Sequence, residues 1–250
     1  MCRHLAFLGH PLPLGELLLR PPHSLERQSW EPKTQRSGVV NADGFGVGWY
    51  AEGDPVPARY RRATPIWGDP GFADLARVVR TGALLAAVRG ATVAGPDGEA
   101  AAAPFASGRW LFSHNGAVPG WPDVLAPVAA TLPAPALLAL EARTDSALIW
   151  ALALHRLRNG EPPGRALAGT VREVAEAAPG ARLNLLLTDG ATIAATTWGD
   201  SLCYLTGPDR TVVASEPYDD DPRWTAVPDR TVLTAARTGV VLSPIEEPSP

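Results

Sequence analysis

The second residue of this 250-residue chain is a cysteine, directly after the initiator methionine. Cells usually remove that methionine when a small residue follows it, so we expect the mature chain to begin at Cys2. An N-terminal cysteine carries a thiol and a free α-amine on one residue, which joins a nucleophile to a general base. Their ordinary pKa values, ~8.5 and ~7.7–8.0, lie close to working pH. Taken alone, the Met-Cys start also fits a small buried residue on a first strand.

A second motif, Arg89-Gly90-Ala91-Thr92, ends an apolar strand predicted over 84–91. An arginine in that position can hold a substrate carboxylate with two parallel hydrogen bonds, and Thr92 can add a hydroxyl to the same pocket. A surface arginine paired with an acidic neighbour is the alternative.

A third motif, His114-Asn115-Gly116, follows a strand predicted over 109–114. The Asn115 amide and the Gly116 backbone N–H form a compact pair of donors, as acyl transfer needs where its oxyanion develops; each donor is typically worth ~2.7–4 kcal/mol. Asn-Gly is also a common turn former. His114 is either a substrate-binding residue or a structural histidine.

A fourth motif, Thr144-Asp145-Ser146, stands at the start of a predicted helix. Asp145 can bind a substrate ammonium group, or it can cap the helix. Alternate glycines at Gly44, Gly46 and Gly48 enter a strand and could form a floor beneath a substrate, although a tight turn before a strand explains them equally well.

Together these residues supply a thiol, a base, an oxyanion hole, and clamps for a carboxylate and an ammonium group, which suits the α-amino-acid end of a γ-glutamyl group. Their order over residues 2–145 resembles that of class II glutamine amidotransferases, whose glutaminase domains are N-terminal nucleophile hydrolases. The resemblance implies Cys2 as nucleophile and Asn115 with Gly116 as oxyanion hole. It also implies substrate-binding residues, which are Arg89 for the α-carboxylate, Asp145 for the α-amine, and Thr92 and His114 in the same pocket.

A narrower resemblance, to the γ-glutamyl amidohydrolases of ergothioneine biosynthesis, lies in the first nine residues and in Ala214-Ser215-Glu216-Pro217. It implies hydrolysis of γ-glutamyl-cysteinyl-hercynine sulfoxide to glutamate and hercynylcysteine sulfoxide through a glutamyl thioester, with no cofactor and no metal. Two other activities stay open: a glutaminase subunit that supplies ammonia to a separate synthase, and an amidase for other N-acyl amines. A non-catalytic binding module of the same fold is the third alternative. The length favours a stand-alone hydrolase, because a glutaminase-like unit fills it.

Strands predominate towards both ends of the chain, and helices cluster in the middle. This pattern predicts an α+β protein, and the resemblance implies a four-layer αββα sandwich with two mostly antiparallel sheets flanked by helices. We expect one domain over residues 2–250 with a poorly ordered tail from Ser243 to Pro250. Predicted helices cover 72–84, 135–159 with an interruption near 144–146, and 165–178; predicted strands cover 2–9, 44–52, 58–63, 84–91, 109–114, 183–188, 191–198, 202–206, 211–215, 231–236 and 240–243.

Three long segments, Gln28–Gly38, Ala94–Ser107 and Pro217–Pro228, are loop-like and could cover a site. If the leaving group is a trimethylated histidine, its cation should favour aromatic faces. Candidate groups in these loops are Trp30, Tyr218 and Trp224, with acids among Asp219–Asp221. That acidic run lacks the ligand spacing of a metal site and is better explained as a solvated loop.

Composition limits the remaining partners. A formal net charge of -4 gives no electrostatic case for nucleic-acid binding, and no apolar run approaches the ~18 residues of a membrane span. Two cysteines are too few for a disulfide framework, which favours a reducing cytoplasm. We therefore expect a cytoplasmic enzyme whose partner is a small γ-glutamyl substrate; the sequence does not determine its oligomeric state.

Overall fold

The computed structural model describes residues 2–35, 38, 40–91 and 98–246, which form two antiparallel sheets. The first sheet has the order β11-β9-β10-β1-β4-β2-β3, with β1 Arg3–Pro13, β2 Phe45–Trp49, β3 Ala58–Arg62, β4 Arg80–Val88, β9 Cys203–Gly207, β10 Arg210–Ala214 and β11 Thr225–Ala226. The second has the order β13-β12-β8-β7-β6-β5, with β5 Phe105–Ser107, β6 Trp110–Ala117, β7 Arg182–Thr188, β8 Ile193–Thr197, β12 Thr231–Ala236 and β13 Gly239–Pro244.

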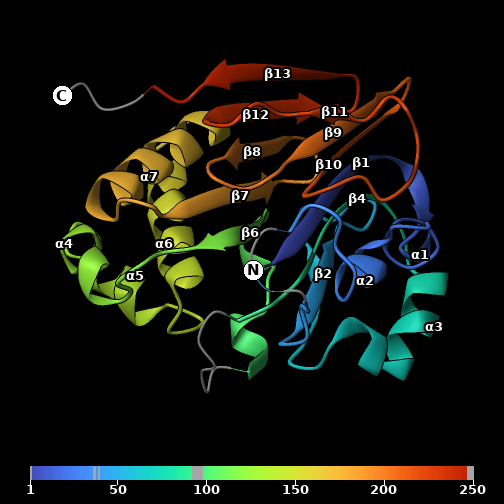
Figure 1. The fold of residues 1–250 in the computed structure, drawn as a ribbon, viewed down its shortest axis with the longest axis horizontal. Coiled ribbons are helices and arrows are strands. Elements are labelled where there is room, and N and C mark those ends of the chain that lie inside the picture. Colours follow the sequence, from blue (N-terminus) through green and yellow to red (C-terminus); the bar gives the residue numbers. More distant parts are fainter. Residues whose placement is uncertain (1, 36–37, 39, 92–97, 247–250) are drawn as a thin grey trace.

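Helices lie outside both sheets (Figure 1). Beside the first sheet are α1 Gly15–Leu18, α2 Leu25–Gln28 and α3 Pro70–Val78. The helices α6 Asp145–Arg158 and α7 Pro163–Ala177 cover the second sheet, and the short α4 Ala126–Ala129 and α5 Ala134–Leu138 lie beside them. Three 3₁₀ turns complete the described elements: Ile66–Gly68, Gly98–Ala101 and Asp123–Leu125.

The alternation of side chains along the strands explains the layers. In β1, Leu5 and Phe7 pack in the core with α1–α3, whereas Ala6 and Leu8 face the second sheet. The strands β4 and β7 divide their apolar residues in the same way. Near-continuous apolar strands are thus buried on both faces, which gives the predicted four-layer αββα sandwich with a core in each of its three interfaces.

Local signals set most of the element boundaries. The helix predicted over 72–84 begins two residues earlier because the Asp69 side chain accepts from Gly71 N at 3.0 Å and Pro70 occupies the first turn. It ends at Val78 because Arg80–Val88 pairs with β1. Sequence patterns did not predict the short elements α1, α2, β5 and β11, which tertiary contacts stabilise.

The glycines at alternate positions serve the contact between the sheets, so the predicted floor beneath a substrate is wrong. A side chain on Gly48 would come within 2.7 Å of Leu111, and one on Gly46 would overlap the carbonyl oxygen of Ala103. Neither glycine lines the large cavity described below. Gly44, with φ +131, turns the chain into β2.

The prediction of a poorly ordered tail is wrong for its first residues, Ser243 to Ile245. Ser243 and Pro244 pair with β12, and Ile245 is buried and donates its backbone N–H to the Arg230 carbonyl at 2.8 Å. Residues 247–250 lie outside the described part of the chain.

Candidate active site

A cavity of about 590 Å³ opens where β4 and β6 end and α6 begins. It brings together five of the seven residues that the sequence predicted: Cys2, Arg89, His114, Gly116 and Asp145. Asn115 is buried behind its wall and contacts Cys2. Thr92 lies outside the described residues.

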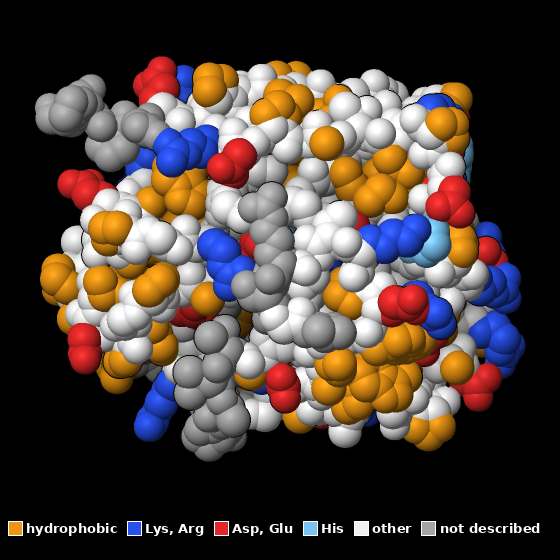
Figure 2. All heavy atoms as spheres, in the orientation of Figure 1, with side chains coloured by type: hydrophobic (Ala, Val, Ile, Leu, Met, Phe, Trp, Pro, Cys, Tyr) orange, Lys and Arg blue, Asp and Glu red, His pale blue; other side chains and the backbone are white. Residues whose placement is uncertain are grey.

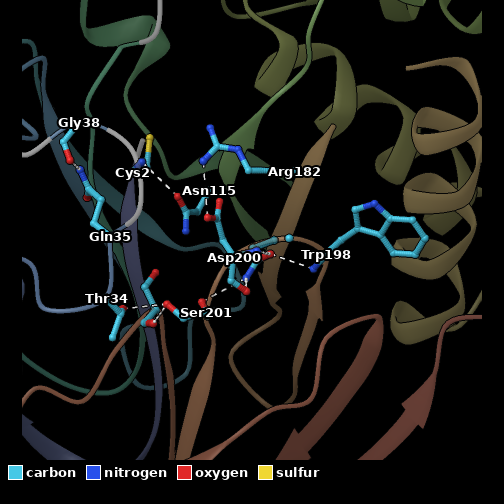
Figure 3. Close-up of polar contacts among 12 residues, drawn as sticks. Cys2, Thr34, Gln35, Gly38, Asn115, Arg182, Trp198, Asp200 and Ser201 are labelled. Carbon is cyan, nitrogen blue, oxygen red and sulfur yellow. Dashed lines mark hydrogen bonds and ion pairs between the residues drawn. The ribbon is translucent and has the colours of Figure 1, made fainter. Parts of the chain in front are cut away.

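Cys2 precedes β1, and its backbone nitrogen donates to Asn115 Oδ1 at 3.1 Å (Figure 3). Because Met1 precedes Cys2 in this chain, that nitrogen belongs to a peptide group, which can donate a hydrogen bond but cannot act as a base. The Nδ2 group of Asn115 is buried and has no partner among the described residues. Asn115 therefore keeps an unused donor beside the nucleophile.

The surroundings of the Cys2 thiol act on its charge in opposite directions. Burial raises the pKa of the thiol, while the backbone N–H of Gly90 and the positive charge of Arg89 work against that rise. Because burial prevails, the sulfur carries its proton at neutral pH, and attack on a carbonyl requires a base.

Asn115 and Gly116 lie within β6, paired with Asn184 and Leu183 of β7, so the turn predicted as the alternative for this dipeptide is wrong. A side chain at Gly116 would overlap the carbonyl oxygen of Arg182. Glycine is required here because the two strands approach each other at the cavity wall.

The loop that carries Arg89 is held by Asp43, in the segment before β2. Asp43 donates its backbone N–H to the Arg89 carbonyl at 2.9 Å and accepts from Arg89 Nη1 at 3.1 Å through its own carbonyl. Its Oδ2 accepts from Ala91 N at 2.8 Å. These bonds fix Arg89 at the cavity wall, where the rest of its fork of donors can meet a carboxylate.

Thr144, not Asp145, caps α6: its hydroxyl accepts from Ala147 N at 3.2 Å. The carboxylate of Asp145 accepts from the backbone N–H groups of Val118, at 3.1 Å, and Ser146, at 2.7 Å. Both bonds orient a half-buried carboxylate on the cavity wall. Since a carboxylate offers about four lone-pair sites, it can still accept from an ammonium group.

Both ring nitrogens of His114 have partners. Nε2 lies 2.9 Å from the Arg182 carbonyl oxygen, and Nδ1 lies 2.9 Å from Ser146 Oγ. The carbonyl can only accept, so Nε2 carries a proton. This geometry supports a positioning role, in which the buried ring holds Ser146 beside Asp145.

Sequence reasoning missed part of the cavity wall. Phe105, Trp121 and Arg143 line the cavity, and all three lie outside the motifs that the sequence analysis selected. The aromatic side chains predicted for this purpose lie elsewhere, because they belong to the outer side of the first sheet. Trp30 packs edge-on against Trp67, and Tyr218 packs edge-on against Trp224, which donates to Asp219 at 2.7 Å; none of them lines the cavity.

Within the described residues, no group of three or more His, Cys, Asp or Glu side chains could hold a metal ion, and no helix is long and apolar enough to cross a membrane. Cys203 is buried, and burial raises the pKa of its thiol. Figure 2 shows acidic and basic side chains interspersed on one face, with no broad area of either charge.

Comparison with known proteins identifies the family. The family model of class II glutamine amidotransferases matches residues 23–210. This chain belongs to the class II glutamine amidotransferase family. A γ-glutamyl-hercynylcysteine sulfoxide hydrolase of Mycolicibacterium smegmatis is 44% identical over 98% of this chain and 100% of its own length. A hydrolase of the same name from Mycobacterium tuberculosis is 42% identical over 98% of this chain and 97% of its own.

Two solved structures share the fold of this chain. A glutamine aminotransferase class-II domain protein from Silicibacter pomeroyi superposes with a TM-score of 0.67, at 26% identity over 98% of this chain and 100% of its own. The glutamine phosphoribosylpyrophosphate amidotransferase of B. subtilis superposes with a TM-score of 0.65 at 15% identity. The superposition spans 98% of this chain and 49% of the B. subtilis chain. The αββα sandwich is thus the fold of the family.

Proposed function

We propose that this class II glutamine amidotransferase homologue hydrolyses the γ-glutamyl amide bond of γ-glutamyl-hercynylcysteine sulfoxide, releasing glutamate and hercynylcysteine sulfoxide. The observation that carries the proposal is the meeting of Cys2, Arg89 and Asp145 in one cavity. Two relatives that bear the name of this activity, at 42% and 44% identity over nearly the whole chain, support it.

Recognition of the glutamyl half follows from charge. In the proposed complex, Arg89 pairs with the α-carboxylate and Asp145 with the α-ammonium group. Charge-assisted hydrogen bonds of this kind are the strong ones, and a bidentate arginine also fixes orientation. The γ-carbonyl carbon then lies at Cys2, one side-chain length from the two charged ends.

Removal of Met1 turns the peptide nitrogen of Cys2 into an amine. This amine, directly or through one water, accepts the thiol proton as the sulfur attacks the γ-carbonyl carbon. The Gly116 N–H and Asn115 Nδ2 are our candidates for the oxyanion hole. The Cys2 nitrogen remains a donor both as an amine and as the ammonium group, so Asn115 Oδ1 can keep accepting from it while Nδ2, unpartnered within the described residues, donates to the oxyanion.

Collapse of the tetrahedral intermediate breaks the carbon–nitrogen bond. The ammonium group of Cys2 gives its proton to the departing amine, and a glutamyl thioester remains on the sulfur. Water then attacks the thioester while the same amine accepts its proton, and glutamate leaves as the thiol is restored. No step requires a metal or a cofactor.

The size of the cavity supports a bulky leaving group. A glutamyl group has the size of one amino acid, whereas a cavity of about 590 Å³ is in the range that holds much larger ligands. Trp121 and Phe105 also line the cavity. An aromatic wall suits the imidazole ring and the trimethylammonium cation of hercynine.

A cytoplasmic location for the enzyme remains a prediction, which rests on the small number of cysteines in the sequence.

The test is product analysis. Protein freed of Met1, with Cys2→Ala as its control, is incubated with the sulfoxide conjugate or with glutamine, and glutamate, ammonia and the released amine are quantified by mass spectrometry. We expect equal amounts of glutamate and hercynylcysteine sulfoxide, and much slower release of ammonia from glutamine. Rapid turnover of glutamine alone would support the glutaminase subunit, and no turnover of either substrate would support the binding module.

A further inference from the structure

The motif Ala214-Ser215-Glu216-Pro217 lies outside the described lining of the cavity and holds the start of β1 instead. The ladder between β1 and β10 ends with the pair Leu5 and Ala214. Beyond it, Ser215 bonds His4 twice: its backbone N–H donates to the His4 carbonyl at 3.0 Å, and its Oγ accepts from His4 N at 3.0 Å. A serine thus extends the pairing of β1 to within two residues of the proposed nucleophile.

Glu216 is buried and holds a segment that is distant in the sequence. One carboxylate oxygen accepts from Lys33 N at 3.0 Å, and the other accepts from Thr34 N and Thr34 Oγ1, both at 2.8 Å. Ser201 joins the same two segments, because its hydroxyl lies 2.8 Å from both Thr34 Oγ1 and the Ser215 carbonyl oxygen (Figure 3). Residues 33–34 are therefore fastened to the chain directly after β10.

The next residue of that segment contacts the residue after the proposed nucleophile. Gln35 Oε1 accepts from Arg3 Nε at 3.1 Å and from Asn41 Nδ2 at 3.0 Å. Arg3 is fully buried, and its Nη1 and Nη2 atoms have no hydrogen-bond partner among the described residues, so the Gln35 bond decides where the side chain lies. Burial lowers the pKa of the Arg3 guanidinium, and the negative charges of Glu216 and Asp200 oppose that change. Glu216 thus supports Arg3 both through the segment and through its charge.

This network matters because removal of Met1 makes Cys2 the end of the chain. The first residues of a chain are poorly ordered unless contacts hold them. The position of the Cys2 amine and thiol then depends on the peptide bond to Arg3 and on contacts such as that of the nitrogen with Asn115 Oδ1. A displacement of about 1 Å at a reacting group can lower a rate about 10²-fold, so these supports bear directly on turnover.

We propose that Glu216 positions the nucleophile: by fastening residues 33–35 against Arg3, it fixes the mature N-terminus so that the thiol and the amine of Cys2 reach the γ-carbonyl group together. The inference rests on the proposed function and adds the residue that holds its nucleophile in place. Neither Glu216 nor residues 33–35 are among the described residues that line the cavity, so loss of this support should lower kcat and leave KM nearly unchanged.

The kinetic test compares Thr34→Val with Thr34→Ser in protein freed of Met1. Valine has the shape of threonine but lacks the hydroxyl that donates to Glu216, whereas serine keeps it. For γ-glutamyl-hercynylcysteine sulfoxide we expect Thr34→Val to lower kcat about tenfold with KM within about twofold, and Thr34→Ser to retain most of the rate. Glu216→Gln, which turns an amide donor towards a backbone N–H group, should lower kcat about 10²-fold.

Thr192→Val is the matched control. The Thr192 hydroxyl also donates to a carboxylate, that of Asp189 at 3.0 Å, but it lies in the exposed turn between β7 and β8. This variant should leave kcat and KM unchanged. Wild-type kcat in Thr34→Val, a loss that appears in KM alone, or an equal loss in Thr34→Ser would each overturn the proposal.

A second measurement does not depend on the substrate. The chain has two cysteines, so isotope labelling of cysteine gives one set of NMR signals from Cys2 and one from Cys203. In Thr34→Val freed of Met1, the Cys2 signals should move towards those of a disordered chain, while Cys203, in β9, keeps its folded shifts. Unmoved Cys2 signals, or equal changes at both cysteines, would overturn the proposal. If the wild type does not hydrolyse the conjugate, the proposed function fails, and the NMR signals still decide whether Glu216 positions Cys2.

Discussion

The backbone nitrogen of Cys2 donates to Asn115 Oδ1 at 3.1 Å, which connects the start of the first sheet to the second across their interface. This bond joins the proposed nucleophile to the proposed oxyanion donor through the atom that becomes the base. The same contact therefore has different chemistry before and after Met1 is removed, since a peptide nitrogen only donates and a neutral amine also accepts.

Retention of Met1 should abolish turnover. Burial raises the pKa of the Cys2 thiol, so the sulfur needs a base at neutral pH, and a peptide nitrogen cannot be one. Protein fused to a leader that a protease removes to leave Cys2 first should gain activity on cleavage. A second fusion, cleaved to leave Met1 first, is the matched control. Full activity of that control, with Met1 verified by mass spectrometry, contradicts the mechanism.

Asn115→Asp should lower kcat by about 10²–10³, with a small effect on KM. The aspartate keeps an oxygen that can accept from the Cys2 nitrogen, but it loses the Nδ2 donor, which is buried and unpartnered within the described structure. Single-turnover kinetics measures the rate of thioester formation, and circular dichroism checks folding. If the aspartate disrupts folding, Asn115→Ala tests the same donor; wild-type kcat in either folded variant excludes Asn115 from the oxyanion hole.

Ser146→Ala should raise KM for the conjugate about threefold to tenfold and leave kcat nearly unchanged. Its hydroxyl lies 2.9 Å from His114 Nδ1 and 3.3 Å from Asp145 Oδ1, and each such bond is worth about 0.5–1.5 kcal/mol. The Asp145 carboxylate then loses part of its support, while the reacting groups stay in place. Ser113→Ala is the matched control, because that serine contacts His4 and does not line the cavity. Equal KM values in both variants would show that Ser146 does not position the carboxylate.

Local sequence signals predicted much of this site. Cys2 directly precedes an apolar strand, Arg89 directly follows another, and Thr144 caps a helix, so each residue lies where its own segment places it. The Asn-Gly turn signal at 115–116 was overridden, because that glycine packs against the backbone of Arg182 within a sheet.

The other residues of the cavity wall could not be predicted in this way. Trp121 and Arg143 reach the cavity only because the segments after β6 and before α6 fold over the same edge. Neither the hydrophobic periodicity nor the spacing of motifs in the sequence predicts that these two segments lie side by side. The prediction that Trp30 and Tyr218 contact the leaving group is wrong for a related reason, because neither lines the cavity. The presence of aromatic residues in a loop does not indicate which side of a sheet that loop occupies.

Acid should destabilise the protein through His4, which is fully buried. Burial, with the nearby charges of Arg3 and His114, lowers the pKa of His4 to about 3 in the folded protein, against ~6.5 in the unfolded chain. Between these values only the unfolded chain binds the proton, so the free energy of unfolding falls as pH drops below about 6.5. Above about pH 6.5 the unfolded chain no longer gains this proton, so the contribution of His4 to the free energy of unfolding is fully present.

The loss can be assigned with His4→Gln, which cannot titrate and can still pair with Ser113, whose Oγ lies 3.1 Å from His4 Nδ1. Between pH 7.5 and 5.5 the wild type should lose about 1.4 kcal/mol more than the variant, the cost of one proton bound only by the unfolded chain. Urea unfolding at both pH values measures this difference. Equal losses in the two proteins would mean that His4 binds its proton in the folded state as well, which a shift of its ring NMR signals near pH 6.5 would reveal independently.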